Sequence, residues 1–284
     1  MGRYVVATPA TTHELVFEGD RVVKRFVSWD RGEHVREWRG LSLLARHAPG
    51  LAPEPIAARL DEQPPSIVMS RLPGEPLGDA PLTDVQVGAL ADALTRMFTS
   101  VPERELFEVE PMFDPERARA TLLRMRKSVD MREGSHGADP SPTVRKAHET
   151  ALAFTDSPWA ERAAGVGPGA SAAVFGQVDG NLANFLWDGE QVRVVDLEDS
   201  GRTDVAFELA NLVEHISAVH GARLDAERLL AHFSLTPAQS ARLRLCRQAF
   251  AVYWLLRLLP GGSSHRRNPP STLEAQAAHL LALE

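Results

Sequence analysis

The sequence predicts an α+β protein with two lobes: a small antiparallel β-sheet lobe with one helix, and a larger, mainly helical lobe. Three observations lead to this fold class. Short β-rich runs separated by turn residues fill residues 4–72. Helical periodicity and capping sequences predominate after Pro73-Gly74. A single β-rich island near residues 185–195 interrupts the helical part. We therefore predict a small lobe over residues 1–71 and a large lobe over residues 72–284.

Composition limits the classes of function. With 284 residues, 44% of them hydrophobic, the chain can bury a full core. The net charge of −7 and the lack of a basic run interleaved with aromatics argue against a nucleic-acid partner, and a cationic small molecule matches this balance better. The apolar stretch 249–259 is too short to cross a bilayer and contains Arg257. The N-terminus lacks a signal-peptide pattern, so we expect a cytoplasmic protein without a membrane partner.

The elements of the small lobe follow from turn residues and from periodicity. Gly19-Asp20 suits the turn of a hairpin, and apolar residues at helical spacing precede the helix-ending Pro49-Gly50. The predicted elements are strands His13–Glu18 and Arg21–Phe26, a helix over Glu33–Arg46, and a second strand pair, Ile56–Leu60 and Ser66–Ser70.

Capping sequences set the helix starts of the large lobe. Thr83 with Gln86, and Thr236 with Gln239, each form a capping box, and a last helix opens after Pro269-Pro270. The Gly/Ser/Pro-rich segments Glu133–Pro142 and Gly165–Ala170 are predicted loops. The lone cysteine, Cys246, cannot form an internal disulfide and is interpreted as a small apolar residue of a helix.

The β island carries the candidate chemistry. It is predicted to form a hairpin over residues 185–195 with Asp188-Gly189 at the turn. Asn184 and Asp196 flank this hairpin, so antiparallel pairing would bring them side by side, and Asp179 lies five residues before Asn184. Two carboxylates and an amide that converge form a hard-oxygen site suited to magnesium and phosphate groups.

These residues also resemble a known family. The stretches Gln177–Asn184 and Val194–Asp199 are similar to the catalytic loop and the metal-binding segment of aminoglycoside phosphotransferases and their choline-kinase-like relatives. The resemblance implies a protein-kinase-like fold and transfer of the γ-phosphate of ATP to a small-molecule hydroxyl. It further implies that Asp179 is the catalytic base and that Asn184 and Asp196 hold Mg²⁺.

The resemblance extends to the small lobe. Val22–Phe26 is similar to the strand whose lysine contacts the nucleotide phosphates, which selects Lys24. The following helix would supply the glutamate that pairs with this lysine, with Glu37 as first choice and Glu33 as second. Ile67–Gly74 resembles the hinge, where backbone groups near Ser70 and Leu72 would meet adenine.

The sequence departs from the family pattern at two places. Gln177 replaces the usual histidine two residues before the catalytic aspartate, and an amide can supply the same kind of structural hydrogen bond. The segment Thr8–Thr12, where a phosphate-covering loop is expected, contains no glycine. These departures motivate an alternative function, a catalytically degenerate nucleotide-binding protein of the kinase fold. A third hypothesis, a magnesium-dependent hydrolase, leaves Lys24 without a role.

Each residue alone also has an ordinary structural explanation. Asp179 alone would be a turn or cap residue, Lys24 an edge-strand charge and Glu37 a solvated helix residue. On the premise that Lys24 is at least half exposed, Lys24→Ala is expected to weaken nucleotide binding and leave the fold intact. Asp204 and Glu208 are expected to cap and line the start of a helix.

The acceptor is not readable from the sequence. Aminoglycosides, other hydroxylated antibiotics, choline-like alcohols, sugars and nucleosides all remain candidates, and antibiotic resistance is a role that the first two would imply. ATP and GTP both remain open as donors, as do a monomer and a homodimer. The acidic run from Asp196 to Glu208 either lines a pocket for a cationic substrate or combines a metal site with a solvated face.

Overall fold

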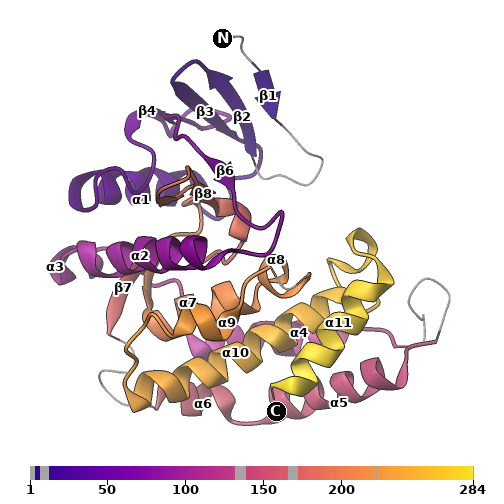
Figure 1. Ribbon diagram of the computed structural model, residues 1–284. Coiled ribbons are helices and arrows are strands. Elements are labelled where there is room, and N and C mark those ends of the chain that lie inside the picture. Colours follow the sequence, from indigo (N-terminus) through magenta and orange to yellow (C-terminus); the bar gives the residue numbers. More distant parts are fainter. Residues whose placement is uncertain (1–3, 7–12, 132–138, 166–171, 222, 284) are drawn as a thin grey trace. The chain divides into compact units, whose positions relative to one another are not determined.

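The computed structural model describes residues 4–6, 13–131, 139–165, 172–221 and 223–283 (Figure 1). The chain separates into two compact units, Met1–Met112 with Ala173–Thr203, and Phe113–Ala172 with Asp204–Glu284. This division of the chain does not coincide with the limit between residues 71 and 72 that the sequence suggests for the two lobes. The β island and a long helix near residue 90 pack with the N-terminal elements. The composition shift at Pro73-Gly74 thus marks a change of secondary structure and not a change of packing unit.

The first unit contains a five-stranded antiparallel sheet. Its strands are β1 (Tyr4–Val6), β2 (His13–Glu18), β3 (Arg21–Phe26), β4 (Pro55–Arg59) and β5 (Ser66–Ser70), in the order β1-β2-β3-β5-β4. The predicted bounds of β2, β3 and β5 are confirmed, and β4 begins one residue earlier than predicted. Because β5 pairs with β3, the strand that carries Lys24 is the centre of the sheet and not an edge.

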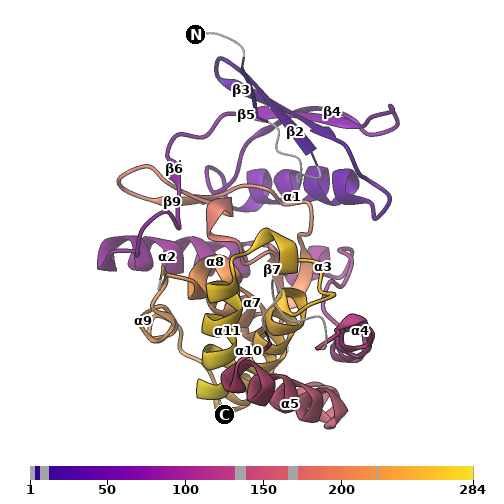
Figure 2. The ribbon, with the colours of Figure 1, turned by 90° about the vertical axis from the view of Figure 1, so that its right-hand side faces the viewer.

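Helix α1 (Glu33–His47) runs along this sheet and contacts β4 and β5 (Figure 2). It buries Leu41 and Leu44 completely, which are one turn apart on the same helix face. Gly40 lies on this helix where its neighbours approach closely: a Cβ there would meet Ser200 Oγ at 2.6 Å. The glycine therefore lets α1, with Glu37 one turn earlier, lie directly against the segment that follows the β island.

The other elements of this unit frame the β island. The capping box at Thr83 starts α2 as predicted, and α2 packs against the strands before and within the island. The first strand of the island pairs with β6 on one side and with β9 on the other. The elements are β6 (Glu75–Pro76), α2 (Asp84–Ser100), α3 (Glu103–Leu106), β7 (Ala173–Gly176), the 3₁₀ helix η1 (Leu182–Asn184), β8 (Phe185–Trp187), β9 (Val192–Val194) and β10 (Gly201–Asp204).

The second unit is a helical bundle built around α10. This helix begins at the predicted capping box of Thr236, contacts α4, α5, α6, α7 and α11, and buries Cys246 as expected. No helix among the described residues is both long and apolar enough to span a bilayer. The elements are α4 (Pro115–Ser128), α5 (Pro142–Asp156), α6 (Trp159–Ala164), α7 (Val205–Glu214), α8 (Ile216–Val219), α9 (Ala226–Leu230), α10 (Pro237–Leu258), η2 (His265–Arg267) and α11 (Pro270–Ala282).

Asp204 has the structural role that the sequence suggests. Its side chain accepts a hydrogen bond from Phe207 N and so caps α7, and it also pairs with the buried Arg242, whose Nη2 lies 2.8 Å from Asp204 Oδ2. Glu208, one turn later, is buried within α7. These two acidic residues therefore belong to the interior of the helical unit. Of the predicted loops, residues 133–138 and 166–170 lie outside the described part of the chain.

Because one histidine of the helical unit is buried, we expect this unit to be less stable towards unfolding at acidic pH. His215 Nδ1 accepts a hydrogen bond from Ser217 N at 3.1 Å and caps α8. Burial, together with the nearby Arg257, lowers the pKa of His215 to about 3. Because the unfolded chain takes up this proton at a higher pH than the folded chain, stability is lost as the pH falls below the unfolded pKa.

The His215→Asn variant tests this linkage. Asparagine can still cap α8 but does not titrate, so the variant should lose less stability than the wild type between pH 7.5 and pH 5. The wild type should lose about 2 kcal/mol more than the variant over the same range, at about 1.4 kcal/mol per pKa unit. Urea unfolding followed by circular dichroism at both pH values measures the difference, and equal losses in the two proteins would contradict the assignment.

Candidate active site

The hairpin of the β island forms around the predicted turn. Asp188 Oδ1 accepts hydrogen bonds from Glu190 N and Gln191 N, and Gly189 takes a φ of 101°, which favours glycine. Across the hairpin, Val195 N donates to Asn184 O at 2.9 Å. Asp196 is the next residue, so the two flanking side chains emerge from neighbouring ends of β8 and β9, as the symmetry of the sequence predicts.

The loop before the hairpin orients Asp179. Its Oδ1 accepts from Asn181 N at 3.1 Å and its Oδ2 accepts from Asn184 Nδ2 at 2.8 Å. Burial raises the pKa of Asp179 to about 6, against these two hydrogen bonds and with a further upward contribution from Asp196. Because the Asn184 amide nitrogen points to Asp179, the amide oxygen of Asn184 is left as the atom that can ligate a cation.

Backbone strain marks both ends of this arrangement. Val178 and Asp196 are the non-glycine residues of the described chain with positive φ, each at 62°. A β-branched valine is rare in this conformation, and such residues cost about 1–3 kcal/mol and concentrate at functional sites. The neighbours of both residues therefore hold the loop and the hairpin end in place.

Gln177 supplies one of these restraints. The side chain is 1% exposed, and its Nε2 donates to Val195 O at 2.8 Å. The amide thus ties the loop of Asp179 to the residue that immediately precedes Asp196. This contact supports the interpretation that glutamine fulfils the structural role of the family's histidine.

Two variants of Gln177 separate a hydrogen-bonding role from a chemical one. Gln177→Leu leaves the Val195 carbonyl without this donor, which should cost about 1–3 kcal/mol of stability and lower turnover. Gln177→His keeps a ring N–H donor and should leave turnover similar or slightly higher. Melting temperatures and steady-state rates of both variants give the comparison. A Gln177→Leu protein with wild-type rate and stability would remove the positioning role.

Lys24 occupies the centre of a carboxylate cluster in the same unit. Its side chain is 2% exposed, and Nζ lies 3.0 Å from Glu37 Oε2, 2.5 Å from Asp196 Oδ1 and 3.2 Å from Glu198 Oε2. The predicted pairing with Glu37 is confirmed. Burial alone would lower the pKa of Lys24, yet the three carboxylates raise it, so the ammonium stays charged.

The second choice for the lysine's partner was wrong. Glu33 instead accepts from Arg31 N at 2.9 Å and Arg31 Nε at 2.8 Å at the start of α1. The premise that Lys24 is half exposed was also wrong, because β3 is central and its face is covered. The expectation that Lys24→Ala leaves the fold intact therefore loses its basis, since the substitution would leave buried carboxylates without their cation.

Sequence reasoning missed the pair His13–Glu198. His13 Nδ1 lies 3.2 Å from Glu198 Oε2, so the start of β2 contacts the segment after β9. One ligand atom each from His13, Asp196 and Glu198 lies within 4.8 Å of the others, a spacing that a metal ion could use. The Lys24 ammonium already contacts both carboxylates, so these three residues are explained by an ion-pair network. The expected phosphate-covering segment lies in residues 7–12, outside the described part of the chain.

A cavity of about 450 Å³ reaches Lys24 and Glu37, whereas Asp179 is not among its lining residues. Phe17, Val22 and Met69 stand opposite one another across β2, β3 and β5 and line it with apolar side chains. Lys24 is two residues from Val22 on the same strand face, about 7 Å along β3. Asn184 and Asp196 also line this cavity. The cavity therefore offers an apolar part and a charged part, as a nucleoside polyphosphate requires.

The predicted hinge residues line this cavity too. Ser70 N donates to Glu54 O at 2.9 Å, so the amide of Ser70 is used inside the sheet. Leu72 follows the end of β5 and lies among the lining residues. Of the backbone groups near Ser70 and Leu72 that were expected to meet adenine, the N–H of Ser70 is thus engaged elsewhere.

The donor set fits a magnesium ion. Asn184 and Asp196 offer an amide oxygen and a carboxylate from one hairpin, and both are hard oxygen donors. A site with one or two carboxylates and further room for phosphate oxygens is the usual form of a Mg²⁺ site in phosphate chemistry. Asp196 is also a quarter exposed, which leaves the carboxylate accessible from the cavity.

The fold and this set of residues define a protein of the kinase-like class. The chain belongs to the phosphotransferase enzyme family, whose model matches residues 18–246. It shares its fold with a choline/ethanolamine kinase family protein from Mesorhizobium loti (16% identity over 99% of this chain and 87% of the other, TM-score 0.64). No curated protein sequence matched the chain.

Two further solved structures share the fold at similarly low sequence identity. Choline kinase LicA from Streptococcus pneumoniae is 13% identical, covering 99% of this chain and 92% of the other, with a TM-score of 0.60. A spectinomycin phosphotransferase in complex with ADP and spectinomycin is 11% identical, covering 98% and 93%, with a TM-score of 0.64. The predicted kinase-like α+β fold is thus confirmed.

Proposed function

We propose that this protein transfers the γ-phosphate of ATP to a hydroxyl group of a small molecule. The observation that carries the proposal is the cavity that gathers a buried, carboxylate-paired Lys24 with Asn184 and Asp196, next to an apolar slot. Membership of the phosphotransferase family supports it. ADP in the spectinomycin phosphotransferase and AMP in LicA support a nucleotide as the donor.

Each residue has a defined task in this reaction. Lys24, held by Glu37, contacts the α- and β-phosphates, and the apolar residues around Val22 take the base, with the Leu72 N–H as its backbone donor. Asp179 accepts a hydrogen bond from the acceptor hydroxyl and orients it for in-line attack. Asn184 and Asp196 hold Mg²⁺, which neutralises phosphate charge when bound.

The energetics of Lys24 favour an active enzyme over a degenerate one. Burying an ammonium and several carboxylates costs several kcal/mol per ion, and apolar residues of similar size are often more stabilising. A protein that only keeps the fold has no physical reason to retain this cluster together with Asp179 and the strained Asp196. The acceptor would be a hydroxylated amine, antibiotic, sugar or alcohol, as spectinomycin is in the related structure.

A panel assay tests the proposal. The protein is incubated with ATP or GTP, Mg²⁺ and pools of aminoglycosides, choline-like alcohols, sugars and nucleosides, and the products are identified by mass spectrometry. We expect phosphorylated product from at least one pool, and at least about a hundredfold less of it from the Asp179→Asn variant. Nucleotide binding without any phosphorylated product, and no gain in the Gln177→His variant, would instead support the degenerate nucleotide-binding alternative.

A further inference from the structure

The loop between α10 and α11 lines a second cavity, which is half open to solvent, in the helical unit. The cavity measures about 420 Å³, within the range of roughly 300–1,000 Å³ that is typical of small-molecule sites. It is lined by Gly261, Gly262, Ser263, His265, Arg266 and Arg267. None of the described residues that line it is acidic, although the whole chain carries a net charge of −7. The loop is therefore positively charged, whereas the whole chain has a negative net charge.

Hydrogen bonds to the end of α10 hold this loop in shape. Ser264 N donates to Arg257 O at 2.9 Å, and Arg257 Nε donates to Ser264 Oγ at 3.0 Å. His265 Nδ1 donates to Leu258 O at 2.8 Å, because a carbonyl can only accept. A Cβ on Gly262 would lie 2.4 Å from Arg257 O, so only a glycine fits at this position. The backbone of the loop therefore packs directly against the end of α10. The loop is thus organised before any ligand arrives.

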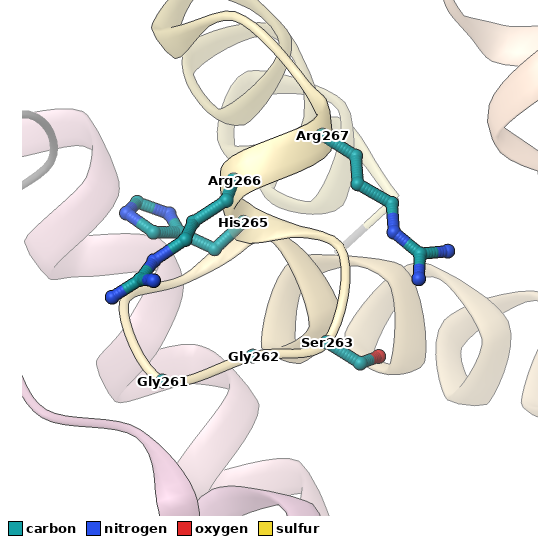
Figure 3. Close-up of a pocket in the computed structure, with 6 residues that line it drawn as sticks. All are labelled: Gly261, Gly262, Ser263, His265, Arg266 and Arg267. Atoms are coloured by element: carbon teal, nitrogen blue, oxygen red, sulfur yellow. The ribbon is translucent and has the colours of Figure 1, made fainter. Parts of the chain in front are cut away.

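The two arginines of the loop are exposed and make no ion pair with any residue in the described ranges. Figure 3 shows His265 and Arg266 extending to one side of the loop, and Arg267 and Ser263 to the other. In contrast, Arg242 and Arg247 in the same unit are paired with Asp204 and Glu214. Two guanidinium groups that have no ion-pair partner among the described residues offer, on a fixed loop, forked donors that match phosphate or carboxylate oxygens.

We propose that this loop binds the phosphate or carboxylate group of a small molecule. Arg266 supplies the main contact, with His265 on the same side of the loop, and Arg267 adds attraction from the other side. The proposal does not rest on phosphoryl transfer. It goes beyond the proposed function because it assigns a binding site for an anion to the helical unit, in a chain whose overall charge favours cations.

Arginine side-chain NMR tests the site directly. Inorganic phosphate, pyrophosphate and citrate are each titrated at constant ionic strength into ¹⁵N-arginine-labelled protein, and the Nε–H signals are assigned with Arg266→Lys and Arg267→Lys. The readout is specific to these residues, so anion binding near Lys24 does not confuse it. We expect saturable shifts of the Arg266 signal with at least one anion, larger than those of Arg267. The phosphate and citrate arms decide between the two ligand groups.

A matched pair of variants controls for net charge. Arg266→Ser with Arg267→Ser removes two positive charges from the loop, whereas Arg117→Ser with Arg244→Ser removes two from exposed helix positions outside the cavity. Calorimetry should show anion affinity at least about tenfold weaker in the first variant and unchanged in the second. Shifts that rise linearly without saturation, or equal affinities in both variants, would overturn the proposal. Phosphoryl transfer measured in the same proteins reports separately on the proposed function.

Discussion

Asp179→Asn is expected to abolish most phosphoryl transfer while ATP still binds. General-base groups contribute about 10²–10⁴-fold to rate, and an asparagine cannot take the proton of the acceptor hydroxyl. The single side-chain oxygen of asparagine can still accept from Asn184 Nδ2, which keeps the amide oxygen of Asn184 in place, whereas the hydrogen bond from Asn181 N is lost. Single-turnover kinetics and equilibrium nucleotide binding, measured on the same preparation, separate the two effects.

Stability provides the control for this variant. Asp179 is largely removed from solvent, and burial of a carboxylate disfavours its charged form. Its replacement by a neutral amide removes this buried charge but also the hydrogen bond from Asn181 N, so the two effects oppose each other and the melting temperature should change little. A variant that loses both nucleotide binding and stability would show that Asp179 holds the loop together, and the role of catalytic base would then lack support.

Local patterns in the sequence were sufficient to predict the framework of the site. Gly19-Asp20 and Asp188-Gly189 define two hairpins whose registers place Lys24 opposite Leu15, and Val195 opposite Asn184. The capping boxes locate the starts of α2 and α10 for the same reason, because each involves residues three apart in the chain.

The parts that could not be predicted depend on contacts between distant segments. His13 and Glu198 are 185 residues apart, and the burial of Lys24 depends on β5 pairing with β3. Gln177 Nε2 donates to a backbone carbonyl. Because every residue has such a carbonyl, no side chain in the sequence indicates this contact. The order of strands in the five-stranded sheet decides the burial of Lys24, and no local periodicity encodes that order.

Lys24→Met is expected to have the second large effect, on both nucleotide binding and stability. Removal of one partner from a buried ion pair costs about 3–5 kcal/mol, because the remaining charge stays buried without compensation. Here Glu37, 1% exposed, loses its cation together with the neighbouring carboxylates. We expect a lower melting temperature and a loss of ATP affinity, measured by calorimetry in the presence of Mg²⁺.

A double variant separates these two consequences. Lys24→Met with Glu37→Gln removes the buried charge along with its partner, so much of the lost stability should return. The ATP affinity should not return, because the ammonium that contacts the phosphates is still missing. If the double variant recovers both properties, Lys24 serves only to neutralise the carboxylate cluster. If it recovers stability alone, the lysine is a phosphate-binding group that Glu37 holds in place, as the kinase-like reaction requires.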